Sequence, residues 1–128
     1  MRLSRERAAL VLVDHQVGLL LGVQDQEQLR RNVIALAKLA AAYQLPVVAT
    51  TSADDGPNGA LPPELAAQLP GVEVIRRPGE IDAFDNAAFA AAVKASGHDQ
   101  LIVAGINTDV CVTFAALSAV AAGHRSRR

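Results

Sequence analysis

Three side chains that could act together in nucleophilic catalysis, Asp14, Arg77 and Cys111, each come shortly after a short apolar stretch. A carboxylate, a fixed positive charge and a thiol are the parts of an activated cysteine nucleophile. In this arrangement Asp14 takes the thiol proton and later returns it to a leaving amine. Arg77 supplies a fixed positive charge that favours the thiolate.

Cys111 is the only cysteine of the chain. Thr108 and Asp109 are typical helix N-cap residues, and the apolar-rich sequence after them predicts a helix whose first turn contains Cys111. The helix dipole and the free N–H groups of a first turn favour a thiolate. Backbone N–H groups at Cys111 and near Thr108 are candidates for an oxyanion hole. The alternative is that Cys111 is a small buried hydrophobic residue, which is common for a free cysteine.

The other two candidates also have structural alternatives. An aspartate at the end of a strand, such as Asp14, often caps a helix or holds a loop, and Arg77 could pair with Asp82 or Asp85 instead. His15 is adjacent to Asp14 and should point elsewhere, which favours an orienting or core role. The common placement of the three candidate residues after strands is what favours catalysis.

Alternating strand and helix patterns predict the elements that carry these residues. Apolar stretches predict strands at residues 8–13, 47–50, 72–75 and 101–104. Helical patterns begin at Gln26, at Glu64, at Asp85 or Asn86, and at Asp109. This order predicts a three-layer α/β/α fold with a parallel, Rossmann-like sheet of about four strands. Ligands bind beyond the carboxyl ends of such strands, where the three candidate residues meet.

Composition excludes several classes of function. The 128 residues suggest one domain, residues 1–123, followed by a basic tail, residues 124–128, that we expect to be solvated and disordered. A net charge of −1 gives no electrostatic case for nucleic-acid binding, and no segment is apolar enough to span a membrane. One cysteine fits a reducing compartment, so we expect a soluble cytoplasmic protein. No zinc-ligand spacing or glycine-rich phosphate loop occurs, and we expect no metal and no cofactor.

Three motifs in chain order resemble the isochorismatase-like cysteine hydrolase family, and most closely its YcaC-type subgroup. These motifs are residues 12–16 (Leu-Val-Asp-His-Gln), residues 77–79 (Arg-Pro-Gly) and residues 105–112 (Gly-Ile-Asn-Thr-Asp-Val-Cys-Val). The resemblance implies the three-layer fold, with Asp14 as base and Cys111 as nucleophile. Arg77 stands where most of the family has lysine, and arginine does not release its proton at usable pH.

The resemblance also carries expectations for the oxyanion site and the substrate. It implies a cis peptide bond between Asn107 and Thr108 beside the oxyanion hole, and we count Asn107, Thr108 and Gln16 as substrate-binding or oxyanion residues. Family members with the cysteine resemble amidases that act on small amides through a thioester. The true isochorismatases lack that cysteine, and the metal-binding Asp-x-His of nicotinamidases has no match here.

The resemblance also implies a homo-oligomer. Members of the family continue for two more strands and helices. We therefore expect a truncated chain, an exposed strand edge at residues 101–104, and self-association. Two functions follow from the sequence. The first is a cysteine-dependent hydrolase of a small amide-type substrate. The second is a catalytically inactive, truncated subunit or interaction protein.

Overall fold

The computed structural model describes residues 3–80, 82–106 and 125–127. Its elements, in chain order, are β1 (Ala8–Val13), α1 (Val17–Leu20), α2 (Gln26–Ala42), β2 (Val47–Ser52), α3 (Pro63–Ala66), β3 (Val74–Arg77), a 3-10 turn (Ala83–Asp85), α4 (Ala87–Ala95), β4 (Gln100–Gly105) and β5 (Arg125–Arg127). The four strands predicted from the sequence are therefore present, as are the helices predicted at α2, α3 and α4.

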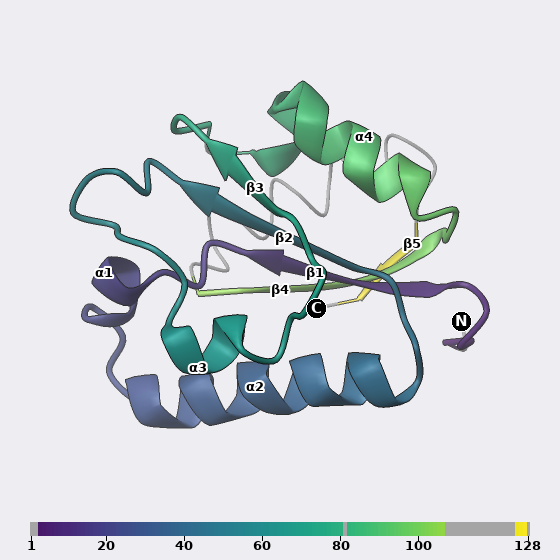
Figure 1. Ribbon diagram of the computed structural model, residues 1–128, viewed down its shortest axis with the longest axis horizontal. Coiled ribbons are helices and arrows are strands. Elements are labelled where there is room, and N and C mark those ends of the chain that lie inside the picture. Colours follow the sequence, from purple (N-terminus) through teal and green to yellow (C-terminus); the bar gives the residue numbers. More distant parts are fainter. Residues whose placement is uncertain (1–2, 81, 107–124, 128) are drawn as a thin grey trace.

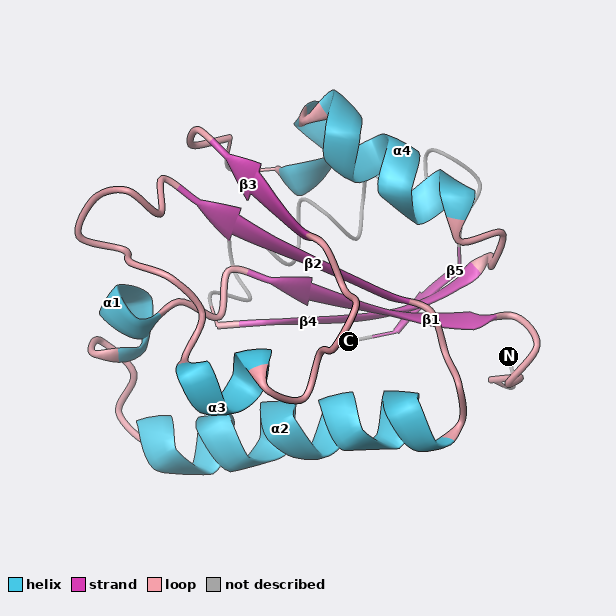
Figure 2. Ribbon diagram, viewed as in Figure 1, coloured by secondary structure: helices cyan, strands magenta, loops and turns pink. Residues whose placement is uncertain are grey.

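The strands form one parallel sheet in the order β3-β2-β1-β4-β5. Helices α2 and α3 cover one face and α4 covers the other (Figure 1; Figure 2), which confirms the predicted α/β/α architecture. All six residues of β1 are buried. A central parallel strand has both faces covered, so its sequence is a continuous apolar run.

Side-chain alternation along β1 divides the core into two clusters. Val11 and Val13 pack with Phe89 and Val93 of α4, whereas Leu10 and Leu12 face the other way, toward α2. Helix α2 contributes a buried stripe, which consists of Val33, Ala37 and Ala40. This spacing of four and three residues keeps one face of the helix on the sheet.

Side-chain caps fix where the helices begin. The Asp25 carboxylate accepts a hydrogen bond from the backbone N–H of Gln28 at the start of α2. Asn86, rather than Asp85, caps α4 by accepting from the N–H of Phe89. The Asp82 side chain accepts from the N–H of Phe84 and caps the 3-10 turn. These contacts satisfy N–H groups that have no partner within their own helix.

The last strand differs from the sequence prediction. Residues 124–128 were expected to be a solvated tail and residues 101–104 an exposed edge, but Arg125–Arg127 pair in parallel with Gln100–Ile102. An uncovered edge strand presents a row of free N–H and C=O groups, and a short extended segment can satisfy them whatever its side chains are. The pairing with β5 covers only the first half of β4. Within the described ranges, no helix is long and apolar enough to cross a membrane.

Candidate functional site

The carboxyl edge of the sheet brings Asp14 and Arg77 together, although 62 residues separate them in the sequence. Asp14 directly follows β1 and Arg77 is the last residue of β3. Strand β2 lies between them, and Arg77 is in register with Ser52 at its end. The backbone of Asp14 has a φ of 60°, a left-handed conformation that aspartate tolerates better than most residues. This turn ends the alternation of β1.

Asp14 and Arg77 form a buried, two-pronged ion pair. Arg77 Nη1 donates to Asp14 Oδ1 at 2.7 Å, and Nη2 donates to Oδ2 at 3.1 Å. The two side chains are 5% and 0% exposed, respectively. Planar guanidinium and carboxylate groups match in this geometry, which fixes the orientation of both. Arg77 therefore pairs with Asp14, not with Asp82 or Asp85 as in the structural alternative.

Two neighbouring groups hold the guanidinium in place. Nη1 of Arg77 also donates to the Thr50 hydroxyl at 3.1 Å, and Nη2 donates to the Glu80 carbonyl oxygen at 2.6 Å. The Thr50 hydroxyl in turn donates to the carbonyl oxygen of Ile75 at 2.7 Å. Thr50 and Glu80 were not predicted from the sequence. Thr50 is a polar residue in an otherwise apolar predicted strand, and this is the signal that could have indicated it.

Asp14 does not serve as a helix cap. Gln16 precedes α1 and its side chain makes no capping hydrogen bond, while both oxygens of Asp14 accept from Arg77. One donor of the guanidinium, Nε, is buried without a hydrogen-bond partner among the described residues. The pair thus presents a fixed carboxylate beside a permanent positive charge.

Gln16 has a different role from the one predicted. Its Nε2 donates to the carbonyl oxygens of Ser52 at 3.0 Å and Gly59 at 2.7 Å, and its Oε1 accepts from the N–H of Ser52 at 2.8 Å. An amide nitrogen has two hydrogens, and both are used. Gln16 therefore has no donor left for an oxyanion, and it instead ties the loop after β2 to the end of β1.

Close backbone packing adds a second tie between these loops. The N–H of Gly18 donates to the Asn58 carbonyl oxygen at 2.8 Å, and the N–H of Val17 donates to Ala60 at 2.9 Å. A Cβ atom at Gly18 would lie 1.9 Å from the carbonyl oxygen of Pro57. Only glycine fits this approach, so the chain after Asp14 is held against the loop by its backbone.

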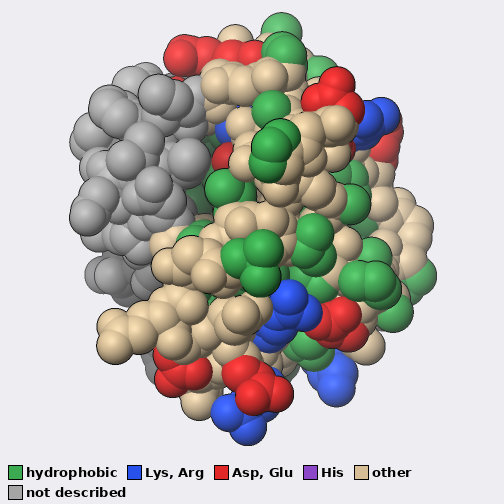
Figure 3. Space-filling model, turned by 90° about the vertical axis from the view of Figure 1, so that its left-hand side faces the viewer, with side chains coloured by type: hydrophobic (Ala, Val, Ile, Leu, Met, Phe, Trp, Pro, Cys, Tyr) green, Lys and Arg blue, Asp and Glu red, His purple; other side chains and the backbone are tan. Residues whose placement is uncertain are grey.

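His15 lies beside Asp14 but makes none of these contacts. It is 2% exposed, and its Nδ1 is buried without a hydrogen-bond partner among the described residues. Burial lowers the pKa of His15 to about 4, so the ring is neutral near pH 7. It lines a cavity of about 390 Å³ between α2 and β4. Figure 3 views the molecule from this carboxyl side, where hydrophobic side chains are exposed between charged ones.

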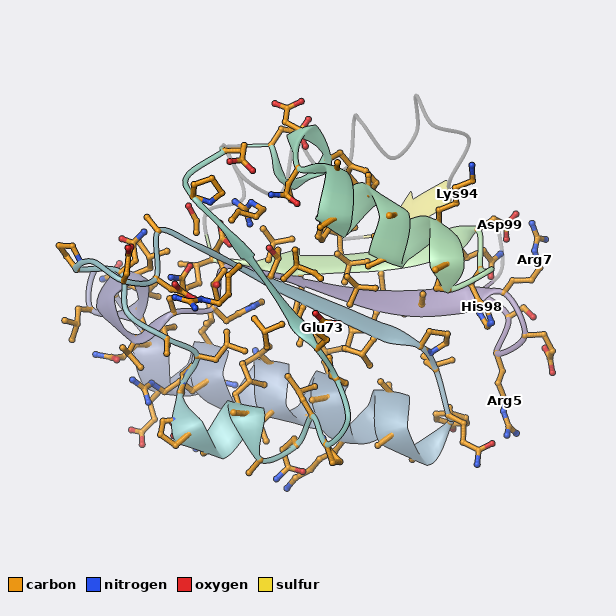
Figure 4. The ribbon with its side chains drawn as sticks, turned by 45° about the horizontal axis from the view of Figure 1, so that its top comes forward. Arg5, Arg7, Glu73, Lys94, His98 and Asp99 are labelled. Atoms are coloured by element: carbon orange, nitrogen blue, oxygen red, sulfur yellow. The ribbon has the colours of Figure 1, made fainter. Side chains whose placement is uncertain are left out.

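A second ion pair lies at the other end of the sheet and is exposed to solvent. Figure 4 shows Arg7 and Asp99 paired near Lys94 and His98, at the end of the molecule where the chain enters β1. The Arg7 and Asp99 side chains are 46% and 45% exposed. Exposed pairs of this kind contribute little to stability. The buried charge pair is at the opposite, carboxyl end.

Several predicted site residues lie outside the described residues. They are Asn107, Thr108, Asp109 and Cys111, and the predicted cis peptide bond is among them. Asp14 and Arg77 meet as the sequence analysis expected, and their catalytic roles remain predictions. In the part of the chain that the structure describes, no group of three or more His, Cys, Asp or Glu side chains could hold a metal ion.

Solved structures with the same fold include two that are about half identical to this chain over the aligned residues. One is the YcaC gene product of Escherichia coli, described as an octameric hydrolase of unknown specificity, with a TM-score of 0.94 and 52% identity. The other is YcaC from Pseudomonas aeruginosa with hexane-2,5-diol and covalent acrylamide, with a TM-score of 0.93 and 50% identity. Each alignment covers 98% of this chain and 63% of the solved chain.

Sequence comparison gives the same relationship. The chain is 53% identical over 124 residues to the probable hydrolase YcaC of Escherichia coli (strain K12). The alignment covers 95% of this chain and 60% of that protein. The chain therefore spans less than two thirds of the length of these relatives. The sequence pattern of the isochorismatase domain family matches residues 8–127. On this evidence, the chain belongs to the isochorismatase domain family.

Proposed function

We propose that this chain is a cysteine-dependent hydrolase that cleaves a small amide-type substrate through a thioester. The observation that carries the proposal is the buried Asp14–Arg77 pair at the carboxyl edge of the sheet. Strand β4 ends at this edge, and the sequence places Cys111 six residues after its last residue, Gly105. A base and a fixed cation therefore lie at the edge where β4 ends, and the chain continues from that edge toward its only cysteine.

The proposed reaction uses Asp14 as a proton carrier. Asp14 takes the proton of the Cys111 thiol, and the thiolate attacks the amide carbonyl carbon to form a C–S bond. When the C–N bond breaks, the amine leaves with the proton that Asp14 returns. Water then attacks the thioester and gives one proton to Asp14. The acid is released, and the proton returns to the Cys111 sulfur.

Arg77 has a positioning and electrostatic role in this scheme. Its guanidinium cannot act as a general acid because it keeps its proton at all usable pH values. Its two hydrogen bonds to Asp14 fix the carboxylate, and its charge favours the thiolate that remains when Asp14 has taken the proton of Cys111. The unpartnered Nε leaves one N–H donor of the group unused among the described contacts.

The relatives support a hydrolase with a reactive side chain. The Escherichia coli relative is named a probable hydrolase, and the Pseudomonas aeruginosa relative was solved with covalent acrylamide. Acrylamide carries an amide group and an electrophilic carbon, and thiolates attack such carbons readily. The octameric state of the Escherichia coli protein supports a homo-oligomer here as well. We further propose a cytoplasmic location, which the single cysteine favours.

Release of ammonia from a panel of small primary amides tests the proposal. We expect turnover by the wild-type chain and loss of turnover in Cys111→Ala and Asp14→Asn, with folding checked by circular dichroism. A mass increase equal to an acyl group on Cys111 during turnover would identify the thioester. Equal turnover by wild type and Cys111→Ala would contradict the role of the cysteine, and no turnover of any amide would favour the inactive subunit that is the alternative.

A further inference from the structure

Negative charge is in excess at the carboxyl end of the sheet, where the buried ion pair lies. Three arginines at this end are each neutralised by one carboxylate, in the pairs Arg77–Asp14, Arg76–Asp54 and Arg30–Glu64. Four more acidic residues lie in the segments that follow β1, β2 and β3, and none of them forms an ion pair with a described residue. They are Asp25, Asp55, Glu80 and Asp85.

The other basic residues do not offset this excess. Arg31 is exposed on α2, two residues before the buried Val33, so it lies on the helix face that points away from the sheet, one turn after Glu27. The remaining Arg and Lys residues of the described ranges lie toward the amino end, before β1, in the second halves of α2 and α4, and in β5. They are Arg5, Arg7, Lys38, Lys94, Arg125 and Arg127. Residues 107–124 contain one Asp and no Arg or Lys.

Arg77 has no donor free for a carboxylate of a substrate. Its Nη1 donates to Asp14 and Thr50, and its Nη2 donates to Asp14 and to the carbonyl oxygen of Glu80. Each of these nitrogens has two hydrogens, so all four are used. Nε is buried, and a single N–H cannot form the two-pronged contact that arginine makes with carboxylates.

Two of the acidic residues without an ion pair lie close to Arg77. Asp55 lines an open cavity of about 250 Å³ together with Arg76 and Arg77. The Glu80 carboxylate accepts a hydrogen bond from the uncharged amide of Asn86 at 2.9 Å, which leaves its negative charge in place. An anion that approaches the buried pair from this side therefore meets like charges.

We infer that the amide substrate of the candidate site has an acyl group that is uncharged or positively charged, and that amides with a carboxylate are rejected. The inference rests on the proposed function and names the class of substrate within it. A bound carboxylate needs a cation or several N–H donors, and the described residues beside the pair offer no unpaired cation. Like charges also slow the encounter, most strongly at low salt.

Alkylation of the folded chain by two reagents of different charge tests the inference. Cys111 is the only cysteine, so iodoacetamide, which is neutral, and iodoacetate, which is an anion, both report on it alone. The ratio of the two rates in the urea-unfolded chain cancels the intrinsic difference between the reagents. We expect the folded chain to prefer iodoacetamide by about fivefold more than the unfolded chain at ~0.01 M salt, and by much less at ~1 M salt.

Two charge variants locate the effect. Asp55→Lys and Glu6→Lys make the same change in net charge at exposed positions, but Asp55 follows β2 at the carboxyl end and Glu6 precedes β1 at the amino end. At ~0.1 M salt the Debye length is about 10 Å, so only nearby charges act. Asp55→Lys should reduce the preference for iodoacetamide about threefold, and Glu6→Lys should leave it unchanged.

Succinamide gives a second readout during turnover. Hydrolysis of one of its two amide groups consumes one water, releases one ammonia and leaves the anion succinamate, which has nearly the same size. We expect wild type to release the first ammonia about tenfold faster than the second, or more.

Three results would overturn the inference and leave the proposed function standing. They are a folded ratio no higher than the unfolded ratio, equal ratios in Asp55→Lys and Glu6→Lys, and release of both ammonia molecules of succinamide at the same rate. A thiol that reacts with neither reagent below about pH 9 would contradict the proposed function, and the inference would fall with it.

Discussion

Asp14 and His15 are adjacent in the sequence and almost equally buried, at 3% and 2% exposure, yet their surroundings are opposite. Both oxygens of Asp14 accept hydrogen bonds from Arg77, whereas Nδ1 of His15 is buried without a hydrogen-bond partner among the described residues. The difference follows from charge. A buried carboxylate must be paired, because an unpaired buried charge costs several kcal/mol. A buried histidine can instead lose its proton and remain neutral.

This contrast assigns different properties to the two sides of the sheet edge. On the Asp14 side, Thr50 and the Glu80 carbonyl hold Arg77 so that the charges are fixed before any substrate arrives. On the His15 side, the ring carries no charge near pH 7 and lies at the border of an open cavity between α2 and β4. Preorganised charge suits catalysis, and a neutral buried ring does not supply it.

The largest expected effect comes from breaking the ion pair. Arg77→Ala should lower the free energy of unfolding by about 3–5 kcal/mol, because it leaves Asp14 buried without its partner. Urea denaturation followed by circular dichroism measures this loss. The double variant Asp14→Asn/Arg77→Met should recover part of it, since no charge is then left buried and asparagine tolerates the left-handed backbone at this position.

The neighbouring arginine is a matched control. Arg76 binds Asp54 through Nε at 3.0 and 2.9 Å and through Nη2 at 2.8 Å, but its side chain is 68% exposed. Arg76→Ala should cost at most about 1 kcal/mol, as is typical of exposed pairs. Equal losses for Arg76→Ala and Arg77→Ala would mean that burial does not distinguish the two pairs.

The second effect concerns the unpaired histidine. The pKa of His15 falls from 6.5 to about 4 on folding. Between these values the unfolded chain binds a proton at His15 and the folded chain does not. The contribution of the neutral His15 to the free energy of unfolding is therefore fully present above about pH 6.5, and it is lost as the pH falls toward 4. We expect a loss of roughly 3 kcal/mol in the free energy of unfolding across this window.

The difference between wild type and His15→Leu isolates this term, because all other titrating groups are common to both. The difference curve should rise with pH between about 4 and 6.5 and be flat on either side. A curve that is flat throughout would show that His15 titrates as it does in the unfolded chain, and the contrast with Asp14 would then fail.

A smaller effect tests the backbone that holds both residues. Gly18→Ala should destabilise the chain by about 1–3 kcal/mol, as overpacking does, because its Cβ would meet the Pro57 carbonyl oxygen at 1.9 Å. Gly22→Ala, whose nearest contact would be the Leu19 carbonyl oxygen at 3.7 Å, is the control and should change stability little. Thermal melts of the two variants compare them directly, and similar melting temperatures would count against the close approach.

Most elements of the fold could be predicted because they have a local signal in the sequence. The apolar run of β1, the helical spacing of α2 and the cap at α4 are all visible in the chain. The meeting of Asp14 with Arg77 was also predictable, since parallel strands place their carboxyl ends at one edge.

Other features depend on contacts that no local pattern contains. The hydrogen bonds of Gln16 join residues about 40 positions apart, and β5 consists of polar residues in a sequence without a strand pattern. The isolation of His15 is a property of its surroundings, which the motif around Asp14 does not indicate. The loop-binding role of the Gln16 side chain was therefore not predictable from the sequence.

The central claim is that the Asp14–Arg77 pair serves a reactive thiol at Cys111, and the pH dependence of iodoacetamide alkylation of the folded chain tests it most directly. Because the helix start predicted from the sequence at Thr108 and Asp109 and the charge of Arg77 both favour a thiolate, we expect a thiol pKa below the ~8.5 of a free cysteine. Arg77→Lys should keep most of this reactivity, and Arg77→Met should slow alkylation near neutral pH. A Cys111 that is inert below about pH 9 and indifferent to Arg77→Met would be a core residue, and the hydrolase proposal would be contradicted.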